Sequence, residues 1–396
     1  MTTGLFARDH TIATSVRADD LPVSIERETA AATEARAVRW PARWRRARPL
    51  RVALIGSPER PTSPGGGEIQ HDALLRALRG LGIDARRGDA GDRDLRALDC
   101  LHLIGSRPEY LPLVAAARRR GVPVVLSTIA WFDFPSRWHA AGSWRSRLRG
   151  CAGMAGRTVF PRWPDWRRRL YDAVDLLLPN SNAEAAQLGR LLRIPLAKIC
   201  VVPNGADPRF AAGDARPFVK RFGVHGFVLY AGRIEPRKNQ LGFLRALRGI
   251  NLPVVMLGDV VPGHQAYLAR CRRTAGTNVR FIGRLEHDDP LLGSAYAACR
   301  CLALTSWFET PGLVALEAGM SGAPLVLTDR GATREYFGPM ARYASPHDEA
   351  EIRRGVLHAM TRPRSVELAR RMQADFTWKR VAEVTLEAYQ SATGKP

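Results

Sequence analysis

Short apolar runs rich in Val, Ile and Leu alternate with amphipathic stretches along most of the chain. In its first part these runs lie at 51–56, 99–105, 122–128, 174–180 and 198–205. Stretches between them, such as YLPLVAAARRRG and AEAAQLGRLL, space their apolar residues as a helix does. Strands that alternate with helices indicate a parallel sheet covered by helices.

The same alternation starts again at FVLYAGR, residues 227–233. We therefore predict an α/β protein of two Rossmann-like, doubly wound parallel-sheet domains that face a cleft. The predicted domains span 49–205 and 206–376, and a helix over 377–396 follows them. Ligands of open α/β sheets bind beyond the carboxyl ends of the strands, so the strand-to-helix turns are where chemistry is expected. The further strand-like runs of the second domain lie at 252–258, 279–284, 301–306, 323–328 and 341–346.

Residues 1–48 differ from the rest of the chain. They are rich in Ala, Thr, Arg and acidic residues, show no strand pattern, and end in RWPARWRRAR. Such a composition can bury little apolar surface, so we predict a disordered basic extension, whose Trp and Arg residues either contact lipid or are solvated. The remainder of the 396-residue chain is long enough for two domains.

The chain carries 60 Lys and Arg residues against 38 Asp and Glu, a net charge of +22. This balance favours anionic substrates or a polyanionic surface, such as a nucleic acid or an anionic membrane. The six cysteines are scattered without the pairing typical of metal sites, which indicates free thiols in a reducing compartment. Because we find no signal-peptide core and no run that could span a bilayer, we expect a cytoplasmic protein, with peripheral binding to the inner face of the cell membrane left open.

A turn with two acids follows the apolar run at 301–306. Glu309 precedes Pro311 and Gly312, and Glu317 lies in the helical stretch LVALEAG that comes next. Proline is favoured in a first helical turn, glycine allows close approach of a ligand, and the free amides of a helix start bind anions. We expect Glu309 on the cleft floor, near a reacting sugar, and Glu317 about two turns into the helix, near a pair of hydroxyls such as a ribose. Taken alone, the spacing also suits a helix-start acid and a surface Glu.

Two further turns carry groups that suit phosphate. Arg233 and Lys238 follow the run at 227–233, and fixed cations at such a turn suit a diphosphate. Gly66 and Gly67 belong to SPGGGEIQHD after the first strand, where a glycine turn can bring amides against phosphate oxygens. This stretch is neither GxGxxG nor a P-loop. The alternatives are solvated bases and a flexible turn.

Together these motifs resemble those of the GT-B glycosyltransferases, in particular the large retaining family 4. The resemblance covers roughly residues 50–390 and rests on the order and spacing of PNGADPRF (203–210), YAGRIEPRKNQ (230–240) and FETPGLVALEAGMSGAPLVLTDRGATREYFG (308–338). It implies the GT-B fold, sugar transfer from a nucleotide-diphosphate sugar with retention of anomeric configuration, and a last helix that crosses back to the first domain.

The resemblance also implies roles for individual residues. Arg233 and Lys238 would hold the diphosphate, and with Glu309, which would contact the donor sugar, they form the expected catalytic set. Glu317 would hold the ribose hydroxyls, backbone near Arg284 would lie along the base, and the glycine run would close over the phosphates. The full donor-binding set is Gly66, Gly67, Arg233, Lys238, Arg284, Glu309, Thr310, Pro311, Gly312, Leu313 and Glu317.

One position departs from the family pattern. Many relatives carry a His after the third apolar run, where this chain has Ile129. His71, His102 and His139 are not obvious substitutes, so no catalytic base is assigned. The DRD at 92–94 imitates the DxD metal site of other glycosyltransferases but precedes a strand. We interpret it as surface charge and expect no essential metal or other cofactor.

Residues 131–171 form a basic, aromatic segment of the first domain. They include five of the nine tryptophans and nine arginines, against two acids. Trp and Arg together suit the interface with anionic lipid headgroups, so we expect contact with an anionic membrane or a lipid-linked acceptor. The alternative is core tryptophans with a solvated arginine rim, which fits a soluble acceptor. The residues assigned to this contact are Trp138, Trp144, Arg145, Arg147, Trp163 and Trp166.

The sequence therefore predicts a glycosyltransferase that uses a UDP- or GDP-linked sugar and a hydroxyl of a saccharide or lipid-linked acceptor. Two other functions fit parts of the sequence. A basic nucleic-acid-binding protein fits the charge, although no nucleic-acid module is recognised and the paired acids would have no task. A nucleotide-sugar epimerase of the same fold fits the donor motifs.

Overall fold

The structure is a computed structural model that describes residues 48–56, 65–88, 95–134, 138, 148–153 and 165–394. The chain divides into residues 1–48 and a compact unit of residues 49–396, and the second unit holds the helices and strands described. The predicted disordered extension therefore lies outside the described residues, except for Arg48.

The first sheet has five parallel strands in the order β2-β1-β3-β4-β5. Its three central strands are mostly apolar and have almost every residue buried, as expected where helices cover both faces of a parallel sheet. In register, Val52 pairs with Cys100, and Leu101 pairs with Val124. The strands are β1 (Arg51–Ile55), β2 (Asp84–Arg87), β3 (Cys100–Ile104), β4 (Val124–Ser127) and β5 (Leu176–Leu177).

Two elements of this sheet differ from the sequence prediction. The hydrophobic pattern does not predict strand β2, because only Ala85 of its four residues, DARR, is buried. The run at 198–205 forms no strand within the described residues, although it follows the sheet edge. Its contact there is a bridge between Leu177 and Ile199, next to a 2.9 Å hydrogen bond from Cys200 N to Leu177 O.

The second sheet has six parallel strands in the order β11-β10-β9-β6-β7-β8. Val228 on its central strand β6 pairs with Val254 on one side and Cys301 on the other. Two parallel sheets in one chain confirm the predicted α/β fold class. The strands are β6 (Val228–Ala231), β7 (Val254–Leu257), β8 (Val279–Gly283), β9 (Cys301–Leu304), β10 (Leu325–Thr328) and β11 (Arg342–Ala344).

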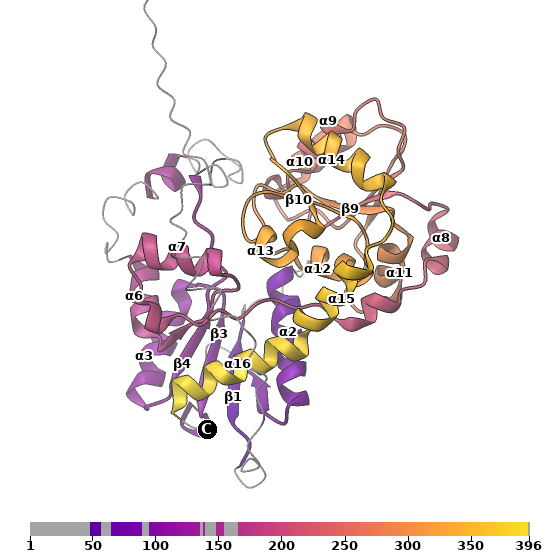
Figure 1. Cartoon of the computed structure of the whole chain (residues 1–396). Helices are drawn as coiled ribbons and strands as arrows, with labels where there is room; N and C mark the ends of the chain where they lie inside the picture. The colour runs from indigo at the N-terminus through magenta and orange to yellow at the C-terminus, as the bar shows by residue number, and fades with distance from the viewer. Residues whose placement is uncertain are drawn as a thin grey trace, which may run out of the picture. The chain divides into compact units, whose positions relative to one another are not determined.

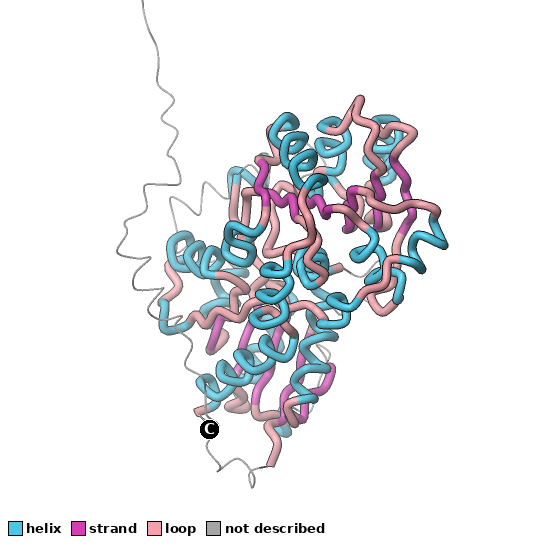
Figure 2. The backbone as a smooth tube through the Cα atoms, turned by 45° about the vertical axis from the view of Figure 1, so that its right-hand side comes forward, coloured by secondary structure: helices cyan, strands magenta, loops and turns pink. Residues whose placement is uncertain are grey.

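Helices follow most of the strands, and in each half the strands lie between helices (Figure 2). The first half contains α2 (Gly66–Gly80), α3 (Leu111–Arg119), α6 (Trp166–Ala173) and α7 (Asn182–Leu192). The second half contains α8 (Arg216–Phe222), α9 (Gln240–Ala246), α10 (Gln265–Thr274), α11 (Pro290–Ala298), α12 (Leu313–Met320), α13 (Thr333–Phe337), α14 (Glu349–Thr361) and α15 (Val366–Asp375), and α16 (Trp378–Thr393) ends the series.

The chain passes between the two halves twice, and the two passages lie side by side. Ala206 N donates to Phe376 O at 2.8 Å, and Ala206 pairs with Thr377 in an isolated bridge. After the second passage, α16 runs over the first sheet beside α2 (Figure 1). Its buried Trp378 and Tyr389 belong to the same apolar cluster as residues of β1, so the last helix is part of the core of the first half.

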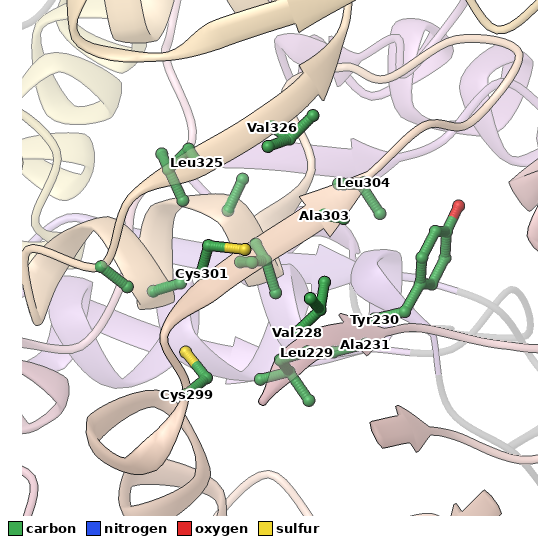
Figure 3. Packing of buried hydrophobic residues seen from close by; sticks show 14 of the residues in the cluster. Val228, Leu229, Tyr230, Ala231, Cys299, Cys301, Ala303, Leu304, Leu325 and Val326 are labelled. Carbon is green, nitrogen blue, oxygen red and sulfur yellow. The ribbon is translucent and has the colours of Figure 1, made fainter. Parts of the chain in front are cut away.

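The core of the second half is packed around β6, β9 and β10 (Figure 3). Cys301 starts β9 and Cys299 lies just before it, and both are buried among apolar side chains. All six cysteines are free. Burial raises the pKa of Cys299 to about 12, so its thiol stays protonated at neutral pH. Among the described helices, none has the length and apolar character that crossing a bilayer requires.

Candidate functional site

A cavity of about 880 Å³ lies at the carboxyl ends of strands from both sheets. It is bounded by the start of α2, the loop after β4, and the turns after β6, β7, β8 and β9. This is the sheet edge at which open α/β folds bind ligands. The structure brings most of the predicted donor-binding set to this cavity, although Pro311 is not among the lining residues. The lining members are Gly66, Gly67, Arg233, Lys238, Arg284, Glu309, Thr310, Gly312, Leu313 and Glu317.

Lys238 and Glu309 form a buried ion pair at the cavity. Lys238 ends a 3₁₀ turn after β6, Glu309 lies in the turn after β9, and Nζ and Oε1 are 2.5 Å apart. Burial lowers the pKa of Lys238, and the attraction of Glu309 opposes this only in part. Burial alone would raise the pKa of Glu309, but Lys238 and Arg237 outweigh it and hold the pKa below its usual value. The site therefore holds an ionised carboxylate beside a cation.

Two glycines allow the backbone to hold Glu309 in place. Gly312 has a φ of 92°, and a Cβ there would lie 2.8 Å from Leu304 Cδ2 and 3.2 Å from Glu309 Oε2. Gly331 has a φ of 99°, and a Cβ there would lie 2.0 Å from Glu309 O. Any side chain at either position would displace the backbone or the carboxylate of the acid.

Helix α12 begins at Leu313, with Gly312 as its N-cap and no side-chain cap. Its first amides lack helical partners, and Leu313 and Val314 line the cavity, so this helix end can bind an anion. Pro311 lies before the helix and follows a cis Thr310–Pro311 peptide. Pro311 therefore lies near the first helical turn, one residue before the N-cap.

Glu317 is the fifth residue of α12, little more than one turn from its start instead of the two turns predicted. It is buried, accepts a hydrogen bond from the Tyr296 hydroxyl at 2.5 Å, and lies 3.0 Å from Nε2 of His287. Each carboxylate oxygen has two lone pairs, so both can still accept from a ligand. Sequence analysis misses His287 and Tyr296, because a single His in a polar turn and a Tyr in an apolar helix form no motif.

The glycine run starts helix α2 instead of forming a loop before it. Gly65 is the N-cap, and Gly66 and Gly67 are the first two residues of the helix. A Cβ at Gly65 would lie 2.9 Å from Nη1 of Arg233, and a Cβ at Gly66 would lie 3.5 Å from Leu313 Cδ1. The start of α2 therefore meets both the Arg233 guanidinium and the start of α12 at the cavity.

The loop after β4 supplies an apolar part of the cavity wall. Ile129 and Trp131 both line the cavity. The Trp131 ring stacks on that of Phe308, with centroids 6.4 Å apart and planes 14° apart. Ile129 is at the position where the family resemblance would place a histidine, so the wall there is apolar instead of basic.

Two of the histidines considered as substitutes, His71 and His102, are described by the structure and do not line the cavity. His102 is fully buried in β3 and bound to two hydroxyl groups, and burial lowers its pKa to about 3. His71 is buried in α2, and His139 lies outside the described residues. Within the part of the chain that the structure describes, His287 is the histidine that lines the cavity.

The basic, aromatic segment 131–171 is described only in part. Trp138 is exposed. Trp166 starts α6, lies beneath the Arg167 guanidinium, and packs against the core of the first half. The DRD at 92–94 lies outside the described residues, as do four of the proposed contact residues: Trp144, Arg145, Arg147 and Trp163.

Two family models cover the two halves of the chain. Glycosyltransferase Family 4 matches residues 42–210, and Glycosyl transferases group 1 matches residues 216–375. The chain belongs to the GT-B glycosyltransferases of family 4. The two matched ranges together contain all the residues that line the cavity.

Several curated glycosyltransferases are similar to part of the chain. It is 31% identical to a D-inositol 3-phosphate glycosyltransferase of Stackebrandtia nassauensis, over 55% of this chain and 54% of that protein. It is 27% identical to O-antigen chain mannosyltransferase B of Escherichia coli, over 55% of this chain and 61% of that protein. It is 32% identical to a glycogen synthase of Mycobacterium tuberculosis, over 55% of this chain and 54% of that protein. The chain thus spans between 54% and 61% of the length of these curated relatives.

Solved structures share the fold at lower identity. Sucrose-phosphate synthase from Thermosynechococcus elongatus matches with a TM-score of 0.66 and 17% identity, over 88% of this chain and 100% of that chain. Anabaena HepE in complex with UDP and glucose matches with a TM-score of 0.63 and 18% identity, over 86% of this chain and 100% of that chain. At these identities the similarity establishes the GT-B fold.

Proposed function

We propose that this glycosyltransferase moves a sugar from a nucleotide-diphosphate sugar to a hydroxyl group of a saccharide or lipid-linked acceptor, with retention of anomeric configuration. The buried Lys238–Glu309 pair carries the proposal, because it places a cation and an ionised acid together in one ligand-sized cavity. Arg233 adds a partly exposed second cation to the same cavity. These three residues form the proposed catalytic set.

The proposed residues act on the bond that breaks. When the bond between the anomeric carbon and the diphosphate opens, the diphosphate leaves with the bonding electrons and its negative charge grows. Arg233, Lys238 and the free amides at the start of α12 stabilise that charge without rearrangement. Glu309 faces the sugar, where its charge stabilises the positive charge on the anomeric carbon. The acceptor oxygen attacks from the face that the diphosphate leaves, and its proton passes to the departing diphosphate.

The nucleotide part is proposed to follow the turns of the second sheet. Glu317 would hold the ribose hydroxyls, and backbone near Arg284 would lie along the base. UDP and GDP both remain candidates for the donor. HepE was solved with UDP and glucose, and starch synthase IV of Arabidopsis thaliana with ADP and acarbose, so a test also needs an ADP-linked sugar.

A donor panel tests the proposed activity. UDP-glucose, GDP-mannose and ADP-glucose are compared by thermal shift, and donors that raise Tm are then assayed for nucleotide release and for the anomeric configuration of the product. We expect one donor to give a glycoside with the donor's configuration, and EDTA to leave the rate unchanged. Turnover that EDTA abolishes and Mg²⁺ restores would contradict the proposed independence from metal. Nucleic-acid binding without turnover, or a free sugar epimer with no glycoside, would favour the two other functions.

The region after β4 also favours a peripheral membrane location. Phe134, Trp138 and Leu148 expose between 41% and 52% of their surface, in a segment rich in arginine. We propose that they contact an anionic membrane on its cytoplasmic side, where a reducing environment suits the free cysteines. The protein should float with anionic vesicles but not with neutral ones, and Phe134→Ser with Trp138→Ser should weaken flotation. Equal recovery with both vesicle types would contradict the proposal.

A further inference from the structure

Glu184 is a buried acid that the proposed chemistry does not use. It lies on α7, and its exposed fraction is 0%. Its Oε1 accepts hydrogen bonds from Thr128 Oγ1 at 2.5 Å and from the Ala130 amide at 2.6 Å. Its Oε2 accepts from the Asn180 amide at 3.0 Å. One carboxyl group therefore ties α7 to the segments that follow β4 and β5.

The sequence around Glu184 predicts a different role from the one observed. Ser181 is the N-cap of α7 and Glu184 follows three residues later, which is the spacing of a capping box. In a capping box the acid would bind the amide of the N-cap residue, but here it binds the amide of Asn180, one residue earlier, and two groups of the loop after β4. Gln187, one turn further along, accepts from the Phe132 amide at 2.8 Å. Helix α7 thus offers two buried acceptors to the loop at 128–132.

The loop that these acceptors hold contains a strained residue. Ile129 has a φ of 45°, a left-handed conformation that β-branched residues rarely adopt. Its two neighbours, Thr128 and Ala130, both donate to the same oxygen of Glu184. The contacts of Glu184 therefore lie on both sides of the strained residue.

Trp131 is held in the same way. The amides of the residues on either side of it are the two that α7 binds. Its ring lines the cavity and stacks on Phe308, the residue next to Glu309. A loop of the first half is thereby brought against the turn that carries the proposed catalytic acid.

We propose that Glu184 and Gln187 are positioning residues that hold Ile129 and Trp131 as the acceptor-side wall of the cavity. An apolar wall beside the reacting carbon excludes water, and so favours transfer to the acceptor over hydrolysis of the donor. The wall role rests on the proposed function, whereas the contact between Glu184 and the strained residue can be tested without any substrate.

Urea unfolding tests that contact directly. Glu184→Gln keeps the shape of the side chain but turns one acceptor into a donor that faces other donors, so the unfolding midpoint should fall. When position 129 is glycine, Glu184→Gln should lower the unfolding midpoint by about half as much or less, because glycine adopts the left-handed conformation without support. Ile129→Val is the matched control, since it keeps the β-branched strain and should show the full fall. If Glu184→Gln lowers the unfolding midpoint equally in the Ile129→Gly and Ile129→Val backgrounds, Glu184 does not support the strained conformation, and the proposal is overturned.

Donor hydrolysis tests the role of the wall. UDP-glucose, GDP-mannose and ADP-glucose are each supplied with and without an acceptor, and Glu184→Gln and Gln187→Ala are compared with the parent. We expect a several-fold rise in the ratio of hydrolysis to transfer, with an unchanged Kd for the free nucleotide. Thr385→Val, which removes a buried hydroxyl on α16, is the control and should leave the ratio unchanged.

The outcomes of the two experiments separate the two proposals. Hydrolysis and transfer that fall in proportion would overturn the wall role while leaving the transferase activity in place. If the parent turns over none of the donors, the proposed function fails, and the wall role fails with it. The urea experiment then still decides whether Glu184 supports Ile129.

Discussion

Each half of the molecule has a buried glutamate at the cavity or behind a loop that lines it, and the two acids are held in opposite ways. Glu309 faces the Lys238 ammonium, and although burial would raise the pKa of the acid, Lys238 and Arg237 together lower it. Glu184 faces a hydroxyl and two amides, and burial raises its pKa despite these hydrogen bonds. The proposed donor side therefore holds a charge, whereas the proposed acceptor side uses an acid to hold a loop.

This difference follows from the partners that each side is proposed to bind. A diphosphate that leaves as an anion needs fixed cations, and a buried cation is tolerated only with a close counter-charge. An acceptor hydroxyl is neutral, so its side of the cavity needs shape and exclusion of water more than charge. Burial of an acid thus has no single functional meaning, and its hydrogen-bond partners decide which role it has.

The most direct test of the different roles of Glu309 and Glu184 is to remove the charge of each acid in turn. Glu309→Ala should abolish transfer, and Glu309→Gln should lower kcat by at least about 100-fold, because the side chain no longer stabilises developing charge. Glu184→Gln should lower kcat far less. Steady-state rates with the donor chosen by the panel give the measurement.

A control is needed because Glu309→Gln leaves the Lys238 ammonium buried without its counter-charge. That change alone can destabilise the fold by about 3–5 kcal/mol. The double variant Lys238→Met with Glu309→Gln should recover much of the stability in urea unfolding while remaining inactive. A double variant that regains transfer would refute the assignment of the donor side.

The two cations of the donor side should differ in their effect on nucleotide binding. Lys238→Ala should raise the Kd for the free nucleoside diphosphate by about 10- to 100-fold, as expected for loss of a buried charge-assisted contact. Arg233→Ala should have a smaller effect, because its side chain is 36% exposed and shared with Glu235. Calorimetry with UDP and GDP provides the values. Arg216→Ala, at a 90% exposed side chain paired with Asp214, is the control and should change nothing.

The sequence predicts the surroundings of Glu309 better than those of Glu184. Glu309 lies in a motif whose spacing reflects a strand, a turn and a helix, so its neighbours along the chain define its surroundings. Glu184 acquires its role from Thr128 and Ala130, more than 50 residues earlier, and the capping-box spacing around it predicts a local bond instead. The apolar alternation likewise predicts the buried strands but misses β2, because an edge strand of DARR has almost no apolar signal.

The positive charge of the chain is a second case in which sequence leaves the role open. Arg364 donates to three carbonyls at the end of α11. Arg353 and Arg168 do the same for carbonyls at the ends of α9 and α7. Cations at these places satisfy backbone acceptors and suit the helix dipole. Part of the surplus that suggested a polyanionic partner is therefore structural, and composition cannot separate the two uses.

Two glycines sharpen the comparison further, one from each half. Gly312→Ala should destabilise the protein by more than about 1 kcal/mol and reduce transfer, because its φ is positive and the new Cβ meets Leu304 and the Glu309 carboxylate.

Gly67→Ala should instead stabilise the protein by about 0.5–1 kcal/mol, since alanine is favoured in a helix. Within the described residues, no atom lies within 4 Å of the added Cβ at Gly67. The same methyl group should weaken nucleotide binding, because it occupies space proposed for the phosphates. Thermal unfolding and calorimetry separate these effects, and a Gly67→Ala that binds UDP and GDP more tightly would contradict the placement.

The smallest expected effect is on the pH dependence of stability, where the two acids should act with opposite signs. Because the pKa of Glu184 is raised above its usual 4.5, the unfolded chain ionises first as the pH rises, and this acid makes the fold less stable from pH 4.5 up to its folded pKa. Because the pKa of Glu309 is lowered, its contribution is complete above pH 4.5 and is lost as the pH falls through its folded pKa. Urea midpoints measured across this range should therefore decline less steeply above pH 4.5 in Glu184→Gln than in the parent. The Lys238→Met, Glu309→Gln variant should differ from the parent mainly below pH 4.5. If the urea midpoints of Glu184→Gln and of the parent change with pH in the same way above pH 4.5, the two acids are not held in opposite ways.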